Sequence, residues 1–185
     1  MHRLGLIRRA LMLLWLALCV PAYADAERWV EVDTAARTLT VFEGDRPLQR
    51  FDNISVGRGG VAPIHYHGDG STPLGSYRIM RIRTPHVFSS FYELDFPLPE
   101  HAEQAFSDGR IDAATRDEIL LAAQAGRMPP QHTALGGGIG IHGIGQGSYR
   151  IHRDFNWTNG CVALSNAQLR QFAQWVRVGM RVVIR

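Results

Sequence analysis

The chain contains no lysine, because all 20 of its basic residues are arginine. This absence excludes lysine-based catalysis. The formal charge of +3 comes from the first 24 residues, which carry three arginines and no acidic residue. The remaining 17 arginines are balanced by 17 acidic residues, so this part of the chain is near neutral. Its charge therefore gives no reason to expect nucleic acid as a partner.

Cysteine is almost absent as well, with Cys19 and Cys161 as its two occurrences. Cys19 lies in the N-terminal segment that we expect to be removed, so a single cysteine remains in the mature chain. An intramolecular disulfide is thereby excluded. A lone thiol in an oxidising compartment is a candidate reactive group.

Long hydrophobic runs are missing except near the N-terminus. Residues 1–24 have the features of a signal peptide: a basic start, an apolar run at 10–20 and the cleavage pattern Ala22-Tyr23-Ala24. No later run approaches the roughly 20 apolar residues that a transmembrane helix needs. We therefore predict a periplasmic mature protein, residues 25–185, that forms a single domain and has no stable membrane insertion.

Short alternating segments dominate the mature chain. Alternation at 29–33 and 39–42 predicts a β-hairpin, and 53–56 and 77–82 are expected to be further strands. The glycine-rich stretch 57–75 predicts a loop. Residues 139–142 and 161–164 predict two buried strands, the first ending in His142, and 181–184 predicts a last strand.

Helix signals are few. Residues 113–125 are compatible with a helix, with a capping box at Thr115 and Glu118. A second capping box, Ser165 with Gln168, precedes the helical spacing of Leu169, Phe172 and Val176. We expect a mainly β (α+β) domain with two or three helices, in which residues 85–133 are a helical insertion.

The segment 141–164 carries most of the chemistry, because it places His142, His152 and Cys161 between two strands. A free cysteine has a pKa near 8.5, and a neighbouring imidazole can increase its thiolate fraction. Gly160 would let the backbone N–H groups of Gly160 and Cys161 approach an oxyanion. Taken alone, however, such a cysteine is more often a buried and inert residue.

Zinc binding is the alternative chemistry for the same residues. Two imidazoles and a thiolate, from His142, His152 and Cys161, are ligands of the right type for zinc. His65, His67 and Asp69 form a second fragment that could contribute to a metal site, although a polar loop beside a binding groove explains them as well.

The motifs in this part of the sequence resemble those of a known family. His142-Gly143 and Thr158-Asn159-Gly160-Cys161 resemble the signature of the L,D-transpeptidase catalytic domain, the YkuD domain. Residues 30–58 are similar to the opening hairpin of that family, and residues 68–77 to its glycine-proline loop. The resemblance covers nearly all of the mature chain and is weakest at 85–133, where the family is variable.

The resemblance implies a β-sandwich-like catalytic domain without a cofactor or metal. Cys161 would be the nucleophile and His142 the general base and acid, on peptidoglycan stem peptides, through a thioester. The amine acceptor would be a second stem, a lipoprotein or a D-amino acid, and carbapenem-type inhibitors would acylate the cysteine. Hydrolysis by an L,D-carboxypeptidase or amidase, and a non-catalytic wall-binding or zinc-binding domain, are the alternatives.

The sequence departs from the commonest form of the family at two positions. Asn159 stands where histidine is usual, and Ala163 where arginine is usual. Arg150 and Arg153 are the nearest replacements for the missing positive charge. An aromatic-rich stretch, 88–96, is a candidate lid. The candidate substrate-binding residues are Gly143, His152, Arg150, Arg153, Thr158 and Asn159.

Overall fold

The computed structural model describes residues 26–185, so the predicted signal peptide lies outside the described residues. The strands are β1 (Arg28–Asp33), β2 (Thr38–Glu43), β3 (Arg46–Asp52), β4 (Val61–Ala62), β5 (Thr72–Pro73), β6 (Gly75–His86), β7 (Ser89–Leu94), β8 (Gly140–Gly143), β9 (Val162–Leu164) and β10 (Arg181–Ile184). The helices are α1 (Pro99–Ser107), α2 (Ala113–Gln124), α3 (Tyr149–Asp154) and α4 (Asn166–Phe172).

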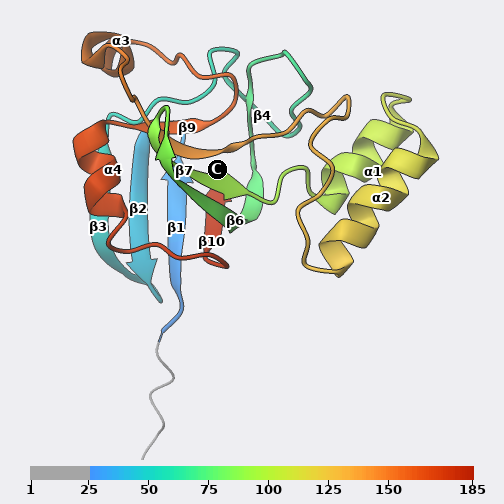
Figure 1. Ribbon diagram of the computed structural model, residues 1–185, viewed down its shortest axis with the longest axis horizontal. Coiled ribbons are helices and arrows are strands. Elements are labelled where there is room, and N and C mark those ends of the chain that lie inside the picture. The colour runs from blue at the N-terminus through green and yellow to red at the C-terminus, as the bar shows by residue number, and fades with distance from the viewer. Residues whose placement is uncertain (1–25) are drawn as a thin grey trace, which may run out of the picture.

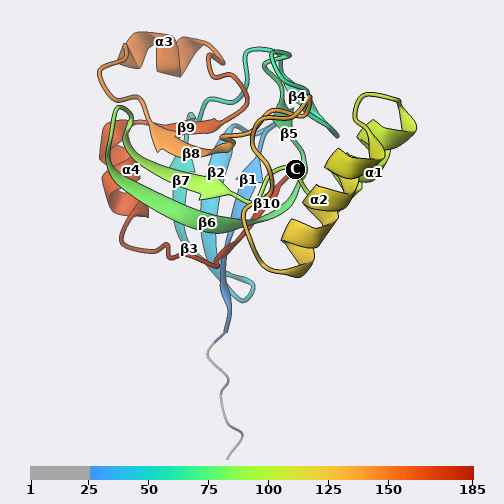
Figure 2. The same cartoon turned by 45° about the vertical axis from the view of Figure 1, so that its right-hand side comes forward.

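One eight-stranded sheet, in the order β3-β2-β1-β10-β6-β7-β8-β9, forms the body of the domain. The first half of the sheet, β3-β2-β1-β10, is joined to the start of β6 by the pairing of β10 with β6. The second half, β7-β8-β9, is joined to the rest of β6 by the pairing of β7 with β6. This 12-residue strand therefore belongs to both halves. Figure 2 shows the ribbons of β6 and β7 crossing in front of β1 to β3. The prediction of a mainly β, sandwich-like domain is confirmed.

The core lies between the two halves of the sheet and under α4. Val30 and Val32 of β1 are fully buried, as the alternation predicted. Phe172 of α4 packs edge-on against Phe51 of β3 and Tyr92 of β7, with ring centroids 6.2 and 5.1 Å apart. Helix α4 thereby joins the edge strand β3 to the half of the sheet that carries β8 and β9.

Of the two capping boxes predicted from the sequence, one is present in the structure and one is not. The capping box of Ser165 and Gln168 is present at the start of α4, as predicted. The predicted capping box at Thr115 is wrong, because Asp112 is the N-cap of α2 and accepts a hydrogen bond from the Thr115 N–H at 2.8 Å. Helix α1 was not predicted, although Pro99 at its first turn is a favourable start signal.

Residues 85–133 are not all helical. Strand β7 lies inside this stretch and pairs with β6 on one side and β8 on the other. The helical part begins at Pro99, and α1 and α2 stand together at one side of the sheet (Figure 1). The strand expected at 53–56 is also misplaced, because β3 ends at Asp52, and Ser55 forms only an isolated bridge to Ala163.

None of the helices in residues 26–185 is long and apolar enough to cross a membrane.

Candidate active site

The parallel pairing of β8 with β9 brings His142 close to Cys161. His142 lies opposite Ala163, and Cys161 directly precedes β9. Because paired residues of a sheet point to the same face, the side chains of Ala163 and His142 share a face, and Cys161 lies two residues before Ala163. All four residues of β8 are buried. The sequence prediction of a buried strand carrying His142 is therefore confirmed.

His142 lies among three aromatic rings and is 3% exposed. Phe88 and Phe91 stack on its imidazole with centroids 4.4 and 5.8 Å away, and Trp157 meets it edge-on at 5.7 Å. Its Nδ1 donates to the Gly143 carbonyl at 2.7 Å, which leaves the lone pair of Nε2 free to accept a proton. Burial lowers the pKa of His142 to about 4, so the ring is neutral at neutral pH.

The Cys161 thiol is also neutral. It donates to the Gly138 carbonyl at 3.3 Å, and burial raises its pKa to about 12. The sequence suggested an imidazole that increases the thiolate fraction, whereas the structure has a neutral thiol beside a neutral imidazole. A reaction at this site therefore requires the thiol to turn from Gly138 and to give its proton to His142 as the new bond forms.

Thr158 holds the loop that carries the thiol. Its Oγ1 donates to the Cys161 carbonyl at 2.6 Å and accepts a hydrogen bond from the Gly160 N–H at 3.2 Å. Thr158 is 3% exposed, so its contacts are with this loop and not with solvent. The Gly160 N–H, a candidate oxyanion donor, is bound to Thr158 here, which leaves the Cys161 N–H as the more direct candidate.

His65 packs against the loop that carries Cys161, a role that the sequence did not indicate. Its Nδ1 lies 2.8 Å from both the Ser71 carbonyl and Asp69 Oδ1. A Cβ atom on Gly160 would stand 3.3 Å from Cε1 of His65, so the ring packs directly against this glycine. Asp69 thus binds a histidine instead of completing a metal site, and His67 is exposed.

The zinc alternatives find no support in the arrangement of side chains. Within residues 26–185, no group of three or more His, Cys, Asp or Glu side chains could hold a metal ion. His152 is 1% exposed and its Nδ1 accepts a hydrogen bond from Trp157 Nε1 at 3.3 Å, so it is bound to an indole and not to Cys161. The fragment from 65 to 69 is likewise occupied by its internal contacts.

The remaining predicted substrate residues divide by exposure. Arg150, Arg153 and Asn159 are exposed, and Arg153 pairs with Asp154 at 2.7 Å. Gly143 is buried, and its N–H donates to the Phe88 carbonyl at 3.1 Å. Only the exposed three can meet a substrate without a rearrangement of the loop.

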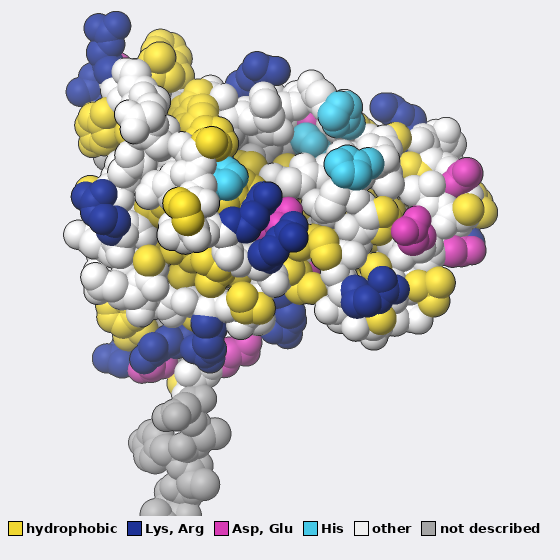
Figure 3. Space-filling view, in the orientation of Figure 1, with side chains coloured by type: hydrophobic (Ala, Val, Ile, Leu, Met, Phe, Trp, Pro, Cys, Tyr) yellow, Lys and Arg dark blue, Asp and Glu magenta, His cyan; other side chains and the backbone are white. Residues whose placement is uncertain are grey.

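Apolar side chains gather around α3, at the upper left of the space-filling view (Figure 3). Tyr149, Ile151 and Phe155 are each about half exposed or more. A small pocket of about 150 Å³ opens here, and its walls are Ile144, Gly147, Ser148, Ile151 and Trp157. Because Trp157 also contacts His142, this apolar surface borders the site.

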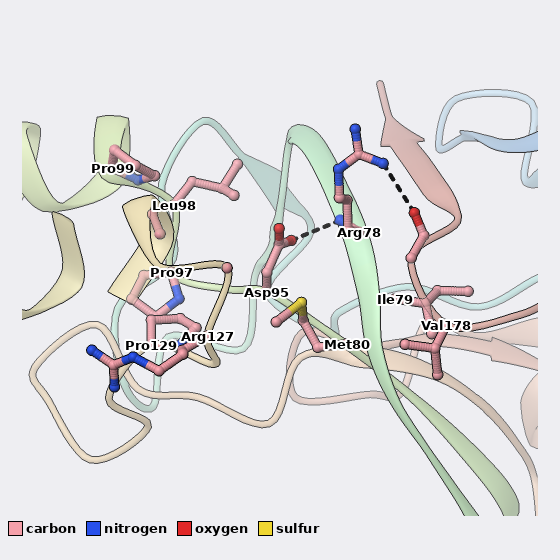
Figure 4. A pocket seen from close by; sticks show the side chains of 13 residues that line it. Arg78, Ile79, Met80, Asp95, Pro97, Leu98, Pro99, Arg127, Pro129 and Val178 are labelled. Carbon is pink, nitrogen blue, oxygen red and sulfur yellow. Dashed lines mark hydrogen bonds between the residues drawn. The ribbon is translucent and has the colours of Figure 1, made fainter. Parts of the chain in front are cut away.

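A larger pocket, of about 550 Å³, lies elsewhere, between β6 and the loops around α1 and α2 (Figure 4). Asp95 accepts a hydrogen bond from the Arg78 backbone N–H at 2.8 Å, and the Arg78 guanidinium donates to the Gly179 carbonyl at 2.9 Å. Neither Cys161 nor His142 lines this pocket. No thiol or histidine lines it, so we place the chemistry at β8 and β9.

Three buried histidines, His101, His142 and His152, predict a stability that falls with acid, because burial lowers the pKa of each. Burial lowers the pKa of both His142 and His152 from 6.5 to about 4. The unfolded state therefore binds more protons between these values, and stability is lost as the pH falls from about 6.5 to about 4. Each shift corresponds to roughly 3 kcal/mol, while Asp95, whose pKa is raised by burial, opposes the trend.

Urea unfolding at pH 7 and pH 5 tests this expectation. The free energy of unfolding should be several kcal/mol lower at pH 5. In a His152→Asn variant, which lacks one of the three titrating rings, the difference should shrink by about a third to a half. An equal loss in both proteins would assign the pH dependence to other groups.

Comparisons with known proteins agree with this geometry. The family model of the L,D-transpeptidase catalytic domain, YkuD, matches residues 27–184. The structure of the helical cell shape determining protein Pgp2 from Campylobacter jejuni is similar, with a TM-score of 0.59 and 22% identity over 88% of this chain and 48% of that one. Bd1075 from Bdellovibrio bacteriovorus has a TM-score of 0.56 and 16% identity over 89% of this chain and 50% of that one.

These likenesses concern the fold, and the chain spans about half the length of the solved structures that it matches. No match was found among curated proteins.

Proposed function

Because the chain belongs to the L,D-transpeptidase catalytic domain family, we propose that it is an exported cysteine acyltransferase. Its substrates are the stem peptides of peptidoglycan, and its role is cell-wall biogenesis or remodelling. The signal-peptide features of residues 1–24 support a periplasmic location. Pgp2, a relative in fold, is named as a determinant of helical cell shape, and we extend a role in cell shape to this chain as part of the proposal.

One observation carries the proposal: β8 and β9 place a neutral imidazole with a free Nε2 beside the only cysteine of residues 26–185. The nucleophile follows a buried glycine, and Thr158 fixes the loop around both. A base on one strand and a nucleophile directly before the neighbouring strand are an arrangement that suits acyl transfer through a thioester.

The geometry supports the following first half-reaction. His142 Nε2 takes the thiol proton while Cys161 Sγ bonds to the carbonyl carbon at the L-centre of diaminopimelate in a tetrapeptide stem. The oxyanion accepts a hydrogen bond from the Cys161 N–H, and from the Gly160 N–H once this donor leaves Thr158. The C–N bond to the terminal D-alanine then breaks, and His142 returns the proton to the departing amine.

The second half-reaction regenerates the enzyme. An acceptor amine loses a proton to His142 and attacks the thioester carbonyl, and the C–S bond breaks. The proton returns to Cys161, so both groups are neutral again, as in the resting structure. Water in place of the amine would give hydrolysis by the same steps.

Product analysis tests the function. The purified protein is incubated with disaccharide-tetrapeptide fragments of peptidoglycan, and the products are separated by chromatography and mass spectrometry. Released D-alanine with cross-linked dimers supports transfer, and released D-alanine with tripeptide stems supports the hydrolytic alternative. Unchanged fragments, with a protein shown to be folded, would reject both.

Gly160 offers a prediction about the nucleophile loop. Its φ of +129° favours glycine, and a Cβ atom would lie 2.8 Å from both Ile139 Cδ1 and the Ser71 carbonyl. Gly160→Ala should displace Cys161 and lower the rate of carbapenem acylation about 100-fold. The free energy of unfolding should fall by about 1–3 kcal/mol.

Gly109→Ala is the matched control. Gly109 also has a positive φ, of +66°, but no atom lies within 4 Å of its added Cβ and it follows α1, away from the site. This variant should lose stability and keep the acylation rate. Equal acylation rates in the two variants, measured by intact mass over time, would contradict the role of Gly160.

A further inference from the structure

His152 is buried close to the site, yet the mechanism above does not use it. The indole N–H of Trp157 can only donate, so Nδ1 of His152 must be the acceptor of the 3.3 Å bond between them. The proton of the neutral ring is then on Nε2. This atom is buried and has no hydrogen-bond partner within residues 26–185. An unpaired buried donor lowers stability, and the bond to Trp157 offsets this loss only in part.

The backbone of His152 is held from the side of the sheet. Ser55 Oγ lies 2.8 Å from the His152 carbonyl and donates to it. The Arg37 guanidinium donates to the same carbonyl at 3.3 Å and to the Ile54 carbonyl at 2.9 Å. The end of α3 is therefore fixed to the segment after β3, and the imidazole is mounted on a rigid support.

Strand pairing connects Ser55, which binds the His152 backbone, to His142. Ser55 bridges Ala163 with two backbone hydrogen bonds of 3.0 and 2.8 Å, and Ala163 is the partner of His142 in the β8–β9 ladder. Paired residues point to the same face, so the side chains of Ser55, Ala163 and His142 form a row. Ser55 Oγ also lies 3.2 Å from Nδ1 of the His152 ring, to which its hydroxyl can donate in place of the His152 carbonyl.

Trp157 contacts both His152 and His142 and so links the two histidines. Its indole N–H binds His152, and its ring meets His142 edge-on at 5.7 Å and Phe88 at 6.3 Å. The small, fully buried Ala163 lies in the middle of the row and leaves space for these rings. A long side chain at position 163 would compete for the same space, which gives a physical reason for the alanine.

We propose that His152 is a positioning residue of the site: through Nδ1 it holds the Trp157 indole against His142 and so keeps the imidazole of the base aimed at Cys161. The inference rests on the proposed function for its effect on rate. The hydrogen bond itself is independent of that function. Misplacement of a catalytic group by about 1 Å can cost 100-fold in rate, so a loss of about 10- to 100-fold is expected when the bond is removed.

Two substitutions of His152 separate hydrogen bonding from packing. His152→Asn places an amide oxygen near the position of Nδ1 and should keep most of the rate of carbapenem acylation. His152→Gln resembles histidine more closely in size but places its amide near Nε2, so it should lose about 10- to 100-fold. If His152 only filled space, the glutamine variant would be the milder one, and that order of rates would overturn the proposal.

Trp157→Phe supplies the second test, because it keeps a ring against His142 but lacks the indole N–H. This variant should lose as much as His152→Gln, and the double variant should lose no more than either single one, because the two residues act through one bond. Losses that multiply in the double variant would reject the link between the two residues. Thermal unfolding of each variant checks that the fold is intact.

A readout that needs no activity separates this proposal from the proposed function. The indole N–H resonance of Trp157, identified by its absence in Trp157→Phe, should shift in His152→Gln and change little in His152→Asn. If the parent protein is not acylated by a carbapenem, the proposed function fails, yet this resonance still decides whether His152 holds Trp157. An unchanged resonance in the glutamine variant would overturn the positioning role whatever the protein catalyses.

Discussion

Replacing Cys161 by alanine is expected to abolish acylation by a carbapenem and the release of D-alanine from tetrapeptide stems. The thiol is the only nucleophile of this kind in residues 26–185, so no neighbouring group can substitute for it. We expect a loss of at least roughly 10⁴-fold, as for removal of a nucleophile from other acyl-transfer sites. Intact mass after incubation with the carbapenem measures the loss directly.

Cys161→Ser is the matched variant for this experiment. The hydroxyl can still donate to the Gly138 carbonyl, which the thiol contacts at 3.3 Å, so the loop should be kept. Its much weaker acidity makes it a poor nucleophile, and acylation should again be lost. A stoichiometric adduct on both variants would show that another residue is acylated, and would remove Cys161 from the mechanism.

The sequence predicted the strands of this site because local patterns determine them. The apolar residues before His142 and after Cys161 indicated two buried strands, and the structure pairs them in parallel. Of the signature residues of the family, His142 and Gly143 lie in β8, and the stretch from Thr158 to Cys161 directly precedes β9. Short helices are less visible, and α3 was missed because its six residues are too few to show a helical repeat.

The environment of the two reactive groups could not be predicted in the same way. Phe88 stacks on His142 from the hairpin between β6 and β7, and His65 packs under Gly160 from a loop far away in the sequence. Such contacts depend on tertiary packing. Burial is also what keeps the thiol protonated, whereas the sequence showed only that an imidazole was near.

The buried position of Thr158 illustrates the same limit. Within a signature, a threonine three residues before the nucleophile suggests contact with the substrate. The structure turns its hydroxyl onto the Cys161 carbonyl and the Gly160 N–H instead. Only the folded arrangement distinguishes a residue that binds substrate from one that shapes the loop around it.

Replacing His142 by asparagine should lower the rate of carbapenem acylation by about 10² to 10⁴-fold, the usual contribution of a general base. The pH dependence should change as well. With His142 neutral above about 4 and Cys161 protonated below about 12, the parent rate should be level across neutral pH and fall as the pH approaches 4. In the variant the thiol must ionise without help, so the rate should rise with pH throughout.

A direct measurement of the charge state of Cys161 and His142 is the control for this prediction. Ultraviolet absorbance of a thiolate, taken as the difference between the parent protein and Cys161→Ala at pH 7, should be absent. Burial favours the pair in which both groups are neutral. A thiolate signal that disappears on replacing His142 would show instead that the resting pair is a charged thiolate and imidazolium. Acylation would then need no proton transfer to His142, and the level rate across neutral pH would be replaced by a rate that falls as the imidazolium loses its proton.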